Sequence, residues 1–492
     1  MNNQSDKTAS PYRVPYNQDC SHLFSIVNKQ GRAMRPADVD GMVDEVADGG
    51  ADLMLINPNG HTARVNYPSR VWQSYWDGRE DISGGVARMK HLADQGCDYL
   101  QRALERCRQK GIGAGVSIRM NDTHNTPWPD DPVHSDFYRE HPEWRIAIPY
   151  RDSGDYATVY PMDYRQPEVP AYVLALIREI VNDYKPDALE LDFMRFPGYF
   201  PVGEGRKNSV IMTGVVREVR KMAGKDIFLT ARVPVTPGAA LDYGLDVADW
   251  AREGLVDGIV VTAHFNTAWD IDMNMWRRVV GEDVVLYAGT ESCAYSPEGS
   301  RNWIMGLDEQ LLRGYAAANY AKGADGIAIF NFFCAREWTG REPLFNAIGQ
   351  LGDPAGLRGK AKTYTITAAA GTWHLGESDG PLQVPRRLET RIPQRFRIGI
   401  GSEPDDLPIE VEAIVEGGTF DSADGFLLHV NDFSVGTAAE IRPAAGIPEN
   451  KPIRAIVFRA TSTVLRPGVN TLVLRNDGPP AKLLSVRFLI LE

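Results

Sequence analysis

The chain has 492 residues, enough for one large domain and a smaller one, or for about three domains of ordinary size. It carries 53 basic and 65 acidic residues, and the net charge of −12 argues against a general nucleic-acid-binding protein, which needs a basic face. With 43% hydrophobic and 24% charged residues, the composition is that of a globular protein and excludes global disorder, collagen and coiled coils.

The N-terminal residues lack an apolar stretch, and no window of the chain approaches about 18 uninterrupted apolar residues. We therefore expect neither a secretory signal peptide nor a membrane span. The five cysteines are few and odd in number, which favours free thiols in a reducing compartment over a disulfide framework. These features predict a cytoplasmic protein, unless a leader has been removed from the chain.

Between residues 20 and 351, short apolar runs alternate with helical patterns. The runs are nearly continuous and rich in β-branched residues, as strands buried on both faces should be. Eight strand-then-helix units predict an α/β fold, a (β/α)₈ TIM barrel, since no glycine-rich nucleotide-binding loop follows the first run. The expected strands are 22–28, 51–59, 113–121, 187–196, 226–234, 257–265, 283–291 and 325–333.

The predicted barrel is flanked by other segments. Residues 1–19 are expected to form an N-terminal extension, and the Gly/Pro-rich segment 352–360 is expected to be a linker. From 361 to 492, short alternating runs separated by turns predict an antiparallel β-sandwich. Its run LRPGVNTLVLRNDG resembles the closing strands of jelly-roll carbohydrate-binding modules. Whether this domain binds sugar or caps the barrel stays open.

Alternate residues of a barrel strand point inward, and those at its carboxyl end meet the substrate. In the fourth expected strand, Glu190 and Asp192 share the inward face, because the apolar residues around them face the helices. Two buried carboxyl groups are costly unless paired and push one pKa upward, which marks a candidate functional site. The same alternation, with the residues directly after the third strand, adds Asn28, Asn57, Asn59, Arg119, Asn121, Asp122, His124, Arg232, His264, Glu291 and Asn331.

This ring of amide, guanidinium, imidazole and carboxyl groups suits a polyhydroxylated substrate, because each hydroxyl group needs hydrogen-bond partners. The long loops 58–90 and 121–166 are expected at the same end of the barrel. They carry aromatic rings such as Trp72 and Trp76, whose flat faces suit sugars, and the carboxylate of Asp163. The sequence therefore predicts an oligosaccharide as partner and neither a nucleic acid nor a membrane.

Glycoside hydrolysis uses two carboxyl groups, one ionised and one protonated. Asp192 and Glu291 lie across the mouth of the predicted barrel, so we expect Asp192 to act as nucleophile and Glu291 as acid/base. The alternatives for the second role are Glu190, Asp122, Asp163 and Glu337.

Three arginines, Arg119, Arg195 and Arg232, fall at adjacent strand ends. Arginine grips carboxylate or sulfate through a bidentate fork, which predicts an anionic sugar, either uronic or sulfated. The alternative is that these arginines neutralise the carboxylates of the site itself.

The stretch 160–198 resembles a segment of the glycoside-hydrolase-like barrel proteins. In that family an Asn or Asp precedes a P-E-V helix start, and the helix leads to a strand of the form D-G-I-h-h-D-h-h-R-Y-P, where h is apolar or variable. The resemblance implies a barrel over most of 20–350, a carbohydrate substrate, and Asp192 in the active site. The matching positions are Asp163, Pro167, Glu168, Val169, Tyr172, Tyr184, Asp187, Asp192, Arg195 and Pro197.

The chain departs from this pattern in two places. Phe193 follows Asp192 where some members carry a second acid, and Glu190 occupies a position that is often less acidic. The Asn-Glu pair of the large retaining β-glycosidase clan is absent from the fourth strand. The arrangement is more like that of the α-galactosidase and α-fucosidase type of retaining enzyme.

Two other functions remain open. A metal-dependent sugar isomerase or lyase could use Glu190, Asp192, His264 and Glu291 as ligands, but no H-x-H follows the first strand and the histidines are not clustered. We therefore expect no metal and no cofactor. A non-catalytic carbohydrate-binding protein is the other alternative, and the presence of Asp192 argues against it. The sequence makes no prediction of oligomeric state.

Overall fold

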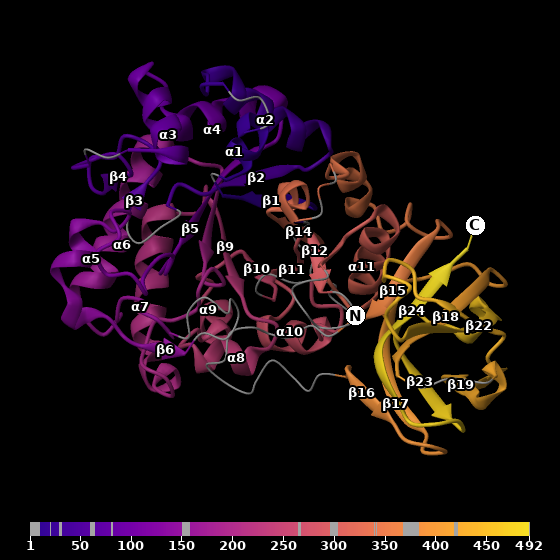
Figure 1. Cartoon of the computed structure of the whole chain (residues 1–492). Coiled ribbons are helices and arrows are strands. Elements are labelled where there is room, and N and C mark those ends of the chain that lie inside the picture. Colours follow the sequence, from indigo (N-terminus) through magenta and orange to yellow (C-terminus); the bar gives the residue numbers. More distant parts are fainter. Residues whose placement is uncertain are drawn as a thin grey trace, which may run out of the picture.

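Eight parallel strands close into a barrel in the order β1-β14-β11-β10-β9-β8-β5-β2, which confirms the predicted fold class. Figure 1 shows the barrel from indigo to salmon, with the C-terminal strands in orange and yellow beside it. The strands are β1 (Pro15–Gln18), β2 (Leu53–Ile56), β5 (Gly113–Arg119), β8 (Ala188–Asp192), β9 (Phe228–Val233), β10 (Gly258–Val261), β11 (Val285–Thr290) and β14 (Gly326–Phe330).

This computed structural model describes most of the chain. The described residues are 10–19, 21–28, 32–59, 64–79, 82–149, 158–263, 267–295, 304–338, 340, 342–367, 383–417 and 422–491.

The first strand differs from its prediction. Residues 22–28, expected as a strand, belong to helix α1 (Ser21–Asn28), whose buried residues Leu23 and Val27 are four apart as on a helix face. The first strand is instead β1, within the segment 1–19 that was expected to be an extension. This four-residue strand was not predicted because Asn17 and Gln18 make it too polar to resemble a buried strand. Asn28, expected at a strand end, belongs to helix α1.

Helices alternate with the strands and cover the barrel. In α4, for example, the Asp98 carboxylate caps the first turn, and Gly111 ends the helix in the left-handed conformation that favours glycine. None of the helices in the described ranges is long and apolar enough to cross a bilayer. The helices are α1, α2 (Pro36–Asp48), α3 (Gly84–Asp94), α4 (Tyr99–Lys110), α5 (Asp136–Glu140), α6 (Glu168–Glu179), α7 (Gly205–Ala223), α8 (Pro237–Asp242), α9 (Val247–Arg252), α10 (Met273–Val280), α11 (Glu309–Ala321) and α12 (Ala335–Trp338), with a π-turn η2 (Ile180–Tyr184) after α6 and short 3₁₀ helices η1 (Pro142–Trp144), η3 (Phe332–Cys334) and η4 (Phe345–Gly352).

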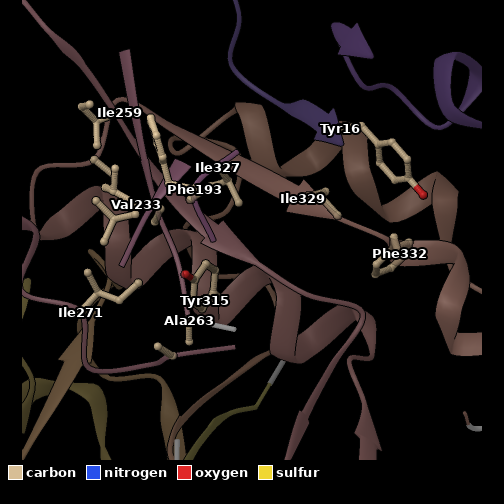
Figure 2. Close-up of a cluster of buried hydrophobic side chains, with 14 of the residues drawn as sticks. Tyr16, Phe193, Val233, Ile259, Ala263, Ile271, Tyr315, Ile327, Ile329 and Phe332 are labelled. Carbon is tan, nitrogen blue, oxygen red and sulfur yellow. The ribbon is translucent and has the colours of Figure 1, made fainter. Parts of the chain in front are cut away.

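The main apolar core lies between the strands and this layer of helices. Side chains that point outward from the strands, such as Val233, Ile259 and Ile327, pack there with Tyr315 of α11 (Figure 2). The alternate side chains of the same strands point into the barrel, so the pleat separates an apolar outer face from the inner positions. This division leaves polar residues inside the barrel at the carboxyl ends of the strands.

Three small two-stranded sheets lie in the loops that follow β2, β5 and β11. They pair β3 (Arg64–Val65) with β4 (Gln73–Ser74), β6 (Ile148–Pro149) with β7 (Thr158–Val159), and β12 (Cys293–Tyr295) with β13 (Ile304–Gly306). These loops leave the carboxyl ends of the strands and therefore surround the mouth of the barrel.

The C-terminal region is an antiparallel β-sandwich, as predicted. One sheet has the order β15-β24-β18-β22-β21 with β16 also paired to β24, and the other has the order β17-β23-β19-β20. Segment 352–360 connects η4 to this domain. The strands are β15 (Lys362–Ile366), β16 (Arg386–Leu388), β17 (Gln394–Ile400), β18 (Pro408–Glu416), β19 (Phe426–Val430), β20 (Phe433–Thr437), β21 (Glu440–Pro443), β22 (Ile453–Thr461), β23 (Gly468–Asn476) and β24 (Ala481–Ile490), with short 3₁₀ helices η5 (Ala423–Gly425) and η6 (Ser462–Val464).

Candidate active site

The carboxyl ends of neighbouring barrel strands carry a layer of buried charges. Asp192 ends β8, and its register partners are Arg119 on β5 and Arg232 on β9. Inward side chains at equal register on parallel strands stand side by side, so these three groups share one level. Glu291 follows β11 directly and is buried as well.

Arg232 joins the two carboxyl groups at the centre of this layer. Its Nη1 donates to both oxygens of Asp192 at 3.0 Å, and its Nη2 donates to Glu291 Oε1 at 3.2 Å. The ring of Phe330 lies against the guanidinium group, 4.0 Å from Cζ. Because one guanidinium bridges them, the two carboxyl groups are closer than the ~9.5 Å upper limit for the paired acids of a glycosidase.

The two oxygens of Asp192 have different surroundings. Oδ1 accepts the backbone N–H groups of Met194 at 2.9 Å and Arg195 at 3.1 Å, in addition to Arg232. From the described part of the chain, Oδ2 accepts one hydrogen bond, donated by Arg232. Oδ2 therefore keeps more free acceptor capacity than Oδ1, whose three hydrogen bonds hold the side chain in place.

Glu291 differs from Asp192 in its protonation. Burial raises its pKa to about 8, because Arg232 and Arg195 offset only part of the lost hydration and Asp192 adds repulsion. At neutral pH Glu291 therefore carries a proton that it can donate. Its backbone N–H donates to Thr267 Oγ1 at 3.2 Å, which ties its position to the loop after β10.

Glu190 lies beneath this pair, one layer deeper in the barrel. Its Oε1 accepts hydrogen bonds from Asn17 Nδ2 and from Ser117 Oγ, the latter at 2.9 Å. Burial, followed by the charge of Asp192, raises its pKa. Glu190 also lines a small cavity of about 10 Å³, room for about one water molecule.

Asp19, directly after β1, is a further candidate site residue that the sequence analysis did not identify. Its Oδ2 accepts hydrogen bonds from Arg119 Nη2 and Asn331 Nδ2, both at 2.9 Å. Burial alone would raise its pKa, but Arg119, Arg195 and the Asn331 amide outweigh burial and hold the pKa at about 2. The alternation of Asn17 and Asp19 in segment 13–19 is the signal that could have revealed it.

A second chain of contacts joins Arg119 to Arg195. Arg119 Nη1 donates to Asp122 Oδ2 at 3.0 Å, Asp122 Oδ1 lies 2.7 Å from His124 Nδ1, and His124 Nε2 lies 3.0 Å from Arg195 Nη2. Burial, with the nearby arginines, lowers the pKa of His124 even though Asp122 opposes it. Since a carboxylate only accepts and a guanidinium only donates, neutral His124 carries its proton on Nδ1 and accepts from Arg195 on Nε2.

Three predicted site residues hold backbone in place. Asn59 exchanges hydrogen bonds with the backbone of Arg119, at 2.8 Å to its carbonyl oxygen and 3.2 Å from its N–H group. Asn57 donates to the carbonyl oxygen of Ser117 at 2.9 Å. Asn121 donates to carbonyl oxygens in two other loops, at 2.7 Å and 2.6 Å. Their amides therefore shape the mouth of the barrel through backbone contacts.

Other predicted residues lie further from the pair. Asp163 forms an ion pair with Arg165 at 2.7 Å. Trp72 is 5% exposed and stacks on Tyr172, and it lines a cavity of about 30 Å³ that Arg119 and Asp122 also line. Trp76 is half-buried against the main core.

Two candidates cannot be placed: His264 lies outside the described residues, and so does the side chain of Glu337. In the described part of the chain, no group of three or more His, Cys, Asp or Glu side chains could hold a metal ion. The cation between Asp192 and Glu291 is the guanidinium group of Arg232.

No family model and no curated protein sequence matches the chain. Solved structures with similar folds include three glycoside hydrolases. The α-galactosidase of Thermus thermophilus in complex with stachyose shares 16% identity at a TM-score of 0.32, over 57% of this chain and 54% of that one. The acarbose-bound α-amylase of Geobacillus thermoleovorans shares 12% at a TM-score of 0.40, over 95% and 99% of the two chains. The endo-β-1,4-mannanase of Thermotoga petrophila shares 10% at a TM-score of 0.43, over 97% of each chain. At these values the likeness carries no information about the activity of this chain.

Proposed function

We propose that this protein is a glycoside hydrolase that cleaves oligosaccharides with the carboxyl groups of Asp192 and Glu291. The observation that carries the proposal is the bridge that Arg232 makes between them. In support of the proposal, the same guanidinium contacts Glu291, whose pKa burial raises to about 8, and Asp192, which accepts four hydrogen bonds, at the mouth of a (β/α)₈ barrel.

In the proposed first step, Asp192 Oδ2 attacks the anomeric carbon while the glycosidic C–O bond breaks. Glu291 transfers its proton to the departing oxygen and becomes a carboxylate. In the second step, Glu291 takes a proton from water as the water oxygen attacks the anomeric carbon. The bond to Asp192 then breaks, so that both acids return to their starting states. Arg232 stays close to both groups and balances the negative charge as it moves from one to the other.

The cluster around Arg119 is proposed to bind sugar hydroxyl groups. Arg119 lies between Asp19 and Asp122, and Asn331 contacts the same Asp19 oxygen. These ion pairs and hydrogen bonds hold the side chains in fixed orientations. That arrangement favours substrates whose hydroxyl groups have matching orientations. In this proposal Asn57, Asn59 and Asn121 act on sugar binding indirectly, because they hold the backbone that carries the cluster.

An anionic sugar remains part of the proposal, with Arg195 as the residue that would meet its charge. Arg119 and Arg232 both form ion pairs with carboxylates of the protein, as in the alternative considered from the sequence. Arg195 donates a hydrogen bond to the neutral ring of His124 at 3.0 Å. A uronic carboxylate or a sulfate group at Arg195 would add a charge-assisted hydrogen bond.

Turnover on a panel of neutral, uronate and sulfated oligosaccharides tests this proposal. The full chain and Asp192→Asn are assayed side by side, with EDTA added in a third arm. Release of sugar by the wild type, its loss in Asp192→Asn, and indifference to EDTA support the glycosidase. Full activity of Asp192→Asn would refute the site, and abolition of turnover by EDTA would replace it with a metal-dependent reaction. Equal rates on neutral and charged sugars would refute the anionic preference.

A further inference from the structure

Helix α11 lies between the barrel and the C-terminal sandwich (Figure 1). On the barrel side, its Tyr315 hydroxyl donates to the carbonyl oxygen of Gly289 in β11 at 2.6 Å. Gly289 is two residues before Glu291, so the helix contacts the strand that carries the proposed acid. Figure 2 shows Tyr315 in the same buried cluster as Ala263 and Ile271.

On its other face, α11 contacts the sandwich closely. A Cβ on Gly314 would lie 2.0 Å from the carbonyl oxygen of Thr363 in β15, so only glycine permits this approach. A Cβ on Gly401, just after β17, would lie 2.6 Å from the Cβ of Ala317. The sandwich therefore fixes the position of α11 against the barrel.

Lys322, the residue after α11, extends this contact toward the mouth of the barrel. It is buried, and its Nζ donates to the carbonyl oxygens of Ile271 at 2.8 Å and Trp269 at 3.3 Å. Its Cε lies 3.2 Å from where a Cβ on Gly399 of β17 would be. Lys322 thus packs on the sandwich and contacts the backbone of residues 267–272, which precede α10 in the loop after β10.

The same loop contacts Glu291. Thr267 Oγ1 accepts the backbone N–H of Glu291 at 3.2 Å and lies 3.0 Å from Thr290 Oγ1. Thr267 is fully buried. A continuous set of contacts therefore runs from β17 through Lys322 and the loop to the backbone of Glu291.

We propose that the C-terminal sandwich positions the acid Glu291, and that Lys322 and Thr267 are the positioning residues through which it acts. This inference rests on the proposed function, in which Glu291 protonates the leaving group. It assigns the sandwich a role in the reaction at the barrel mouth, whether or not it also binds sugar.

The test compares two substrates of the sugar class that the panel identifies: a phenyl glycoside and a 2,4-dinitrophenyl glycoside. A poor leaving group needs the proton of Glu291, and a good one does not. Thr267→Val should therefore lower kcat/KM for the phenyl glycoside, which reports the first step alone, by about 10- to 100-fold, since a small misplacement of a catalytic group has effects of this size. It should leave kcat/KM for the dinitrophenyl glycoside nearly unchanged, and Thr267→Ser should restore kcat/KM for the phenyl glycoside.

Lys322→Met should show the same dependence on the leaving group, and the exposed Lys221→Met is its control. Gly314→Ala and Gly214→Ala form a second matched pair, because a Cβ at Gly214 in α7 meets nothing within 4 Å. Equal losses of kcat/KM on both substrates, or no loss, in Thr267→Val and Lys322→Met would overturn the inference. Glu291→Gln separates the two proposals: if it lacks the leaving-group dependence, the acid assignment itself is wrong.

Discussion

Two clusters at the mouth of the barrel use the same residue types with opposite results. Around Arg119, one guanidinium contacts both Asp19 and Asp122, and the pKa of Asp19 is held at about 2. Around Arg232, one guanidinium contacts Asp192 and Glu291 above the buried Glu190, and the pKa values of both glutamates are raised. The clusters therefore differ in what surrounds the carboxyl groups: Arg119, Arg195 and the Asn331 amide outweigh burial at Asp19, whereas the charge of Asp192 adds to burial at Glu291 and Glu190.

Asp192→Asn should have the largest effect, because it removes the proposed nucleophile. We expect a loss in kcat of roughly 10⁴-fold or more. The amide keeps the shape of the side chain, so the folded state should persist, and thermal unfolding monitors this. Asp94→Asn, in an exposed ion pair on α3, is the control. A variant that retains more than a tenth of the wild-type rate would remove Asp192 from the mechanism.

Activity should fall about tenfold per pH unit above a pH of about 8, where Glu291 loses its proton. The folded state also binds this proton more tightly than the unfolded chain, in which the pKa has its ordinary value of 4.5. The free energy of unfolding should therefore decrease as the pH rises from 4.5 through about 8, and Glu291→Gln should weaken that decrease.

A pH–rate profile of kcat/KM and urea unfolding at several pH values measure both effects. A value of kcat/KM that stays constant from pH 8 to pH 10 would contradict the role of Glu291 as the acid.

Asp19→Asn should have an intermediate effect, expressed in KM. It leaves Arg119 with Asp122 as its carboxylate partner and weakens the binding cluster, at a cost of ~1–3 kcal/mol or roughly 10- to 100-fold in kcat/KM. The limb of the pH profile that reports Glu291 should stay in place. A loss confined to kcat would place Asp19 in the chemical step. The proposed division between a binding cluster at Arg119 and a catalytic cluster at Arg232 would then be wrong.

Glu190→Gln should have the smallest effect, below about tenfold in kcat. With a pKa raised to about 7, Glu190 is protonated in about half of the molecules at neutral pH, and glutamine resembles that neutral form. Steady-state kinetics of Glu190→Gln and Asp192→Asn, measured side by side, show which of the two carboxyl groups of β8 is catalytic. A glutamine variant as inactive as Asp192→Asn would make Glu190 a catalytic carboxylate.

The sequence predicted the parts of this site that depend on strand alternation. Glu190, Asp192 and Arg232 could be placed because a period of two, flanked by apolar residues, shows which side chains point inward. Asp19 was missed because the four residues of β1 carry polar side chains, while the more apolar run 22–28 forms a helix. Because β1 forms hydrogen bonds with a neighbouring strand on each side, it can be part of the barrel with few apolar residues of its own.

The roles of the amides and the protonation of the glutamates could not be predicted. An asparagine after a strand looks the same in sequence whether it meets a substrate or, like Asn59, the backbone of the next strand. The raised pKa of Glu291 depends on how completely distant loops bury it and on where Arg232 divides its hydrogen bonds. Both are properties of the tertiary structure.

The most direct test of the account is covalent trapping of the nucleophile. A 2-deoxy-2-fluoro glycoside with an activated leaving group, of the sugar class that the panel identifies, is incubated with the full chain, and the labelled peptide is mapped by mass spectrometry. The account predicts one sugar bound to Asp192 in the wild type and none in Asp192→Asn. A label on another carboxyl group, or turnover of the substrate without any covalent adduct, would contradict it.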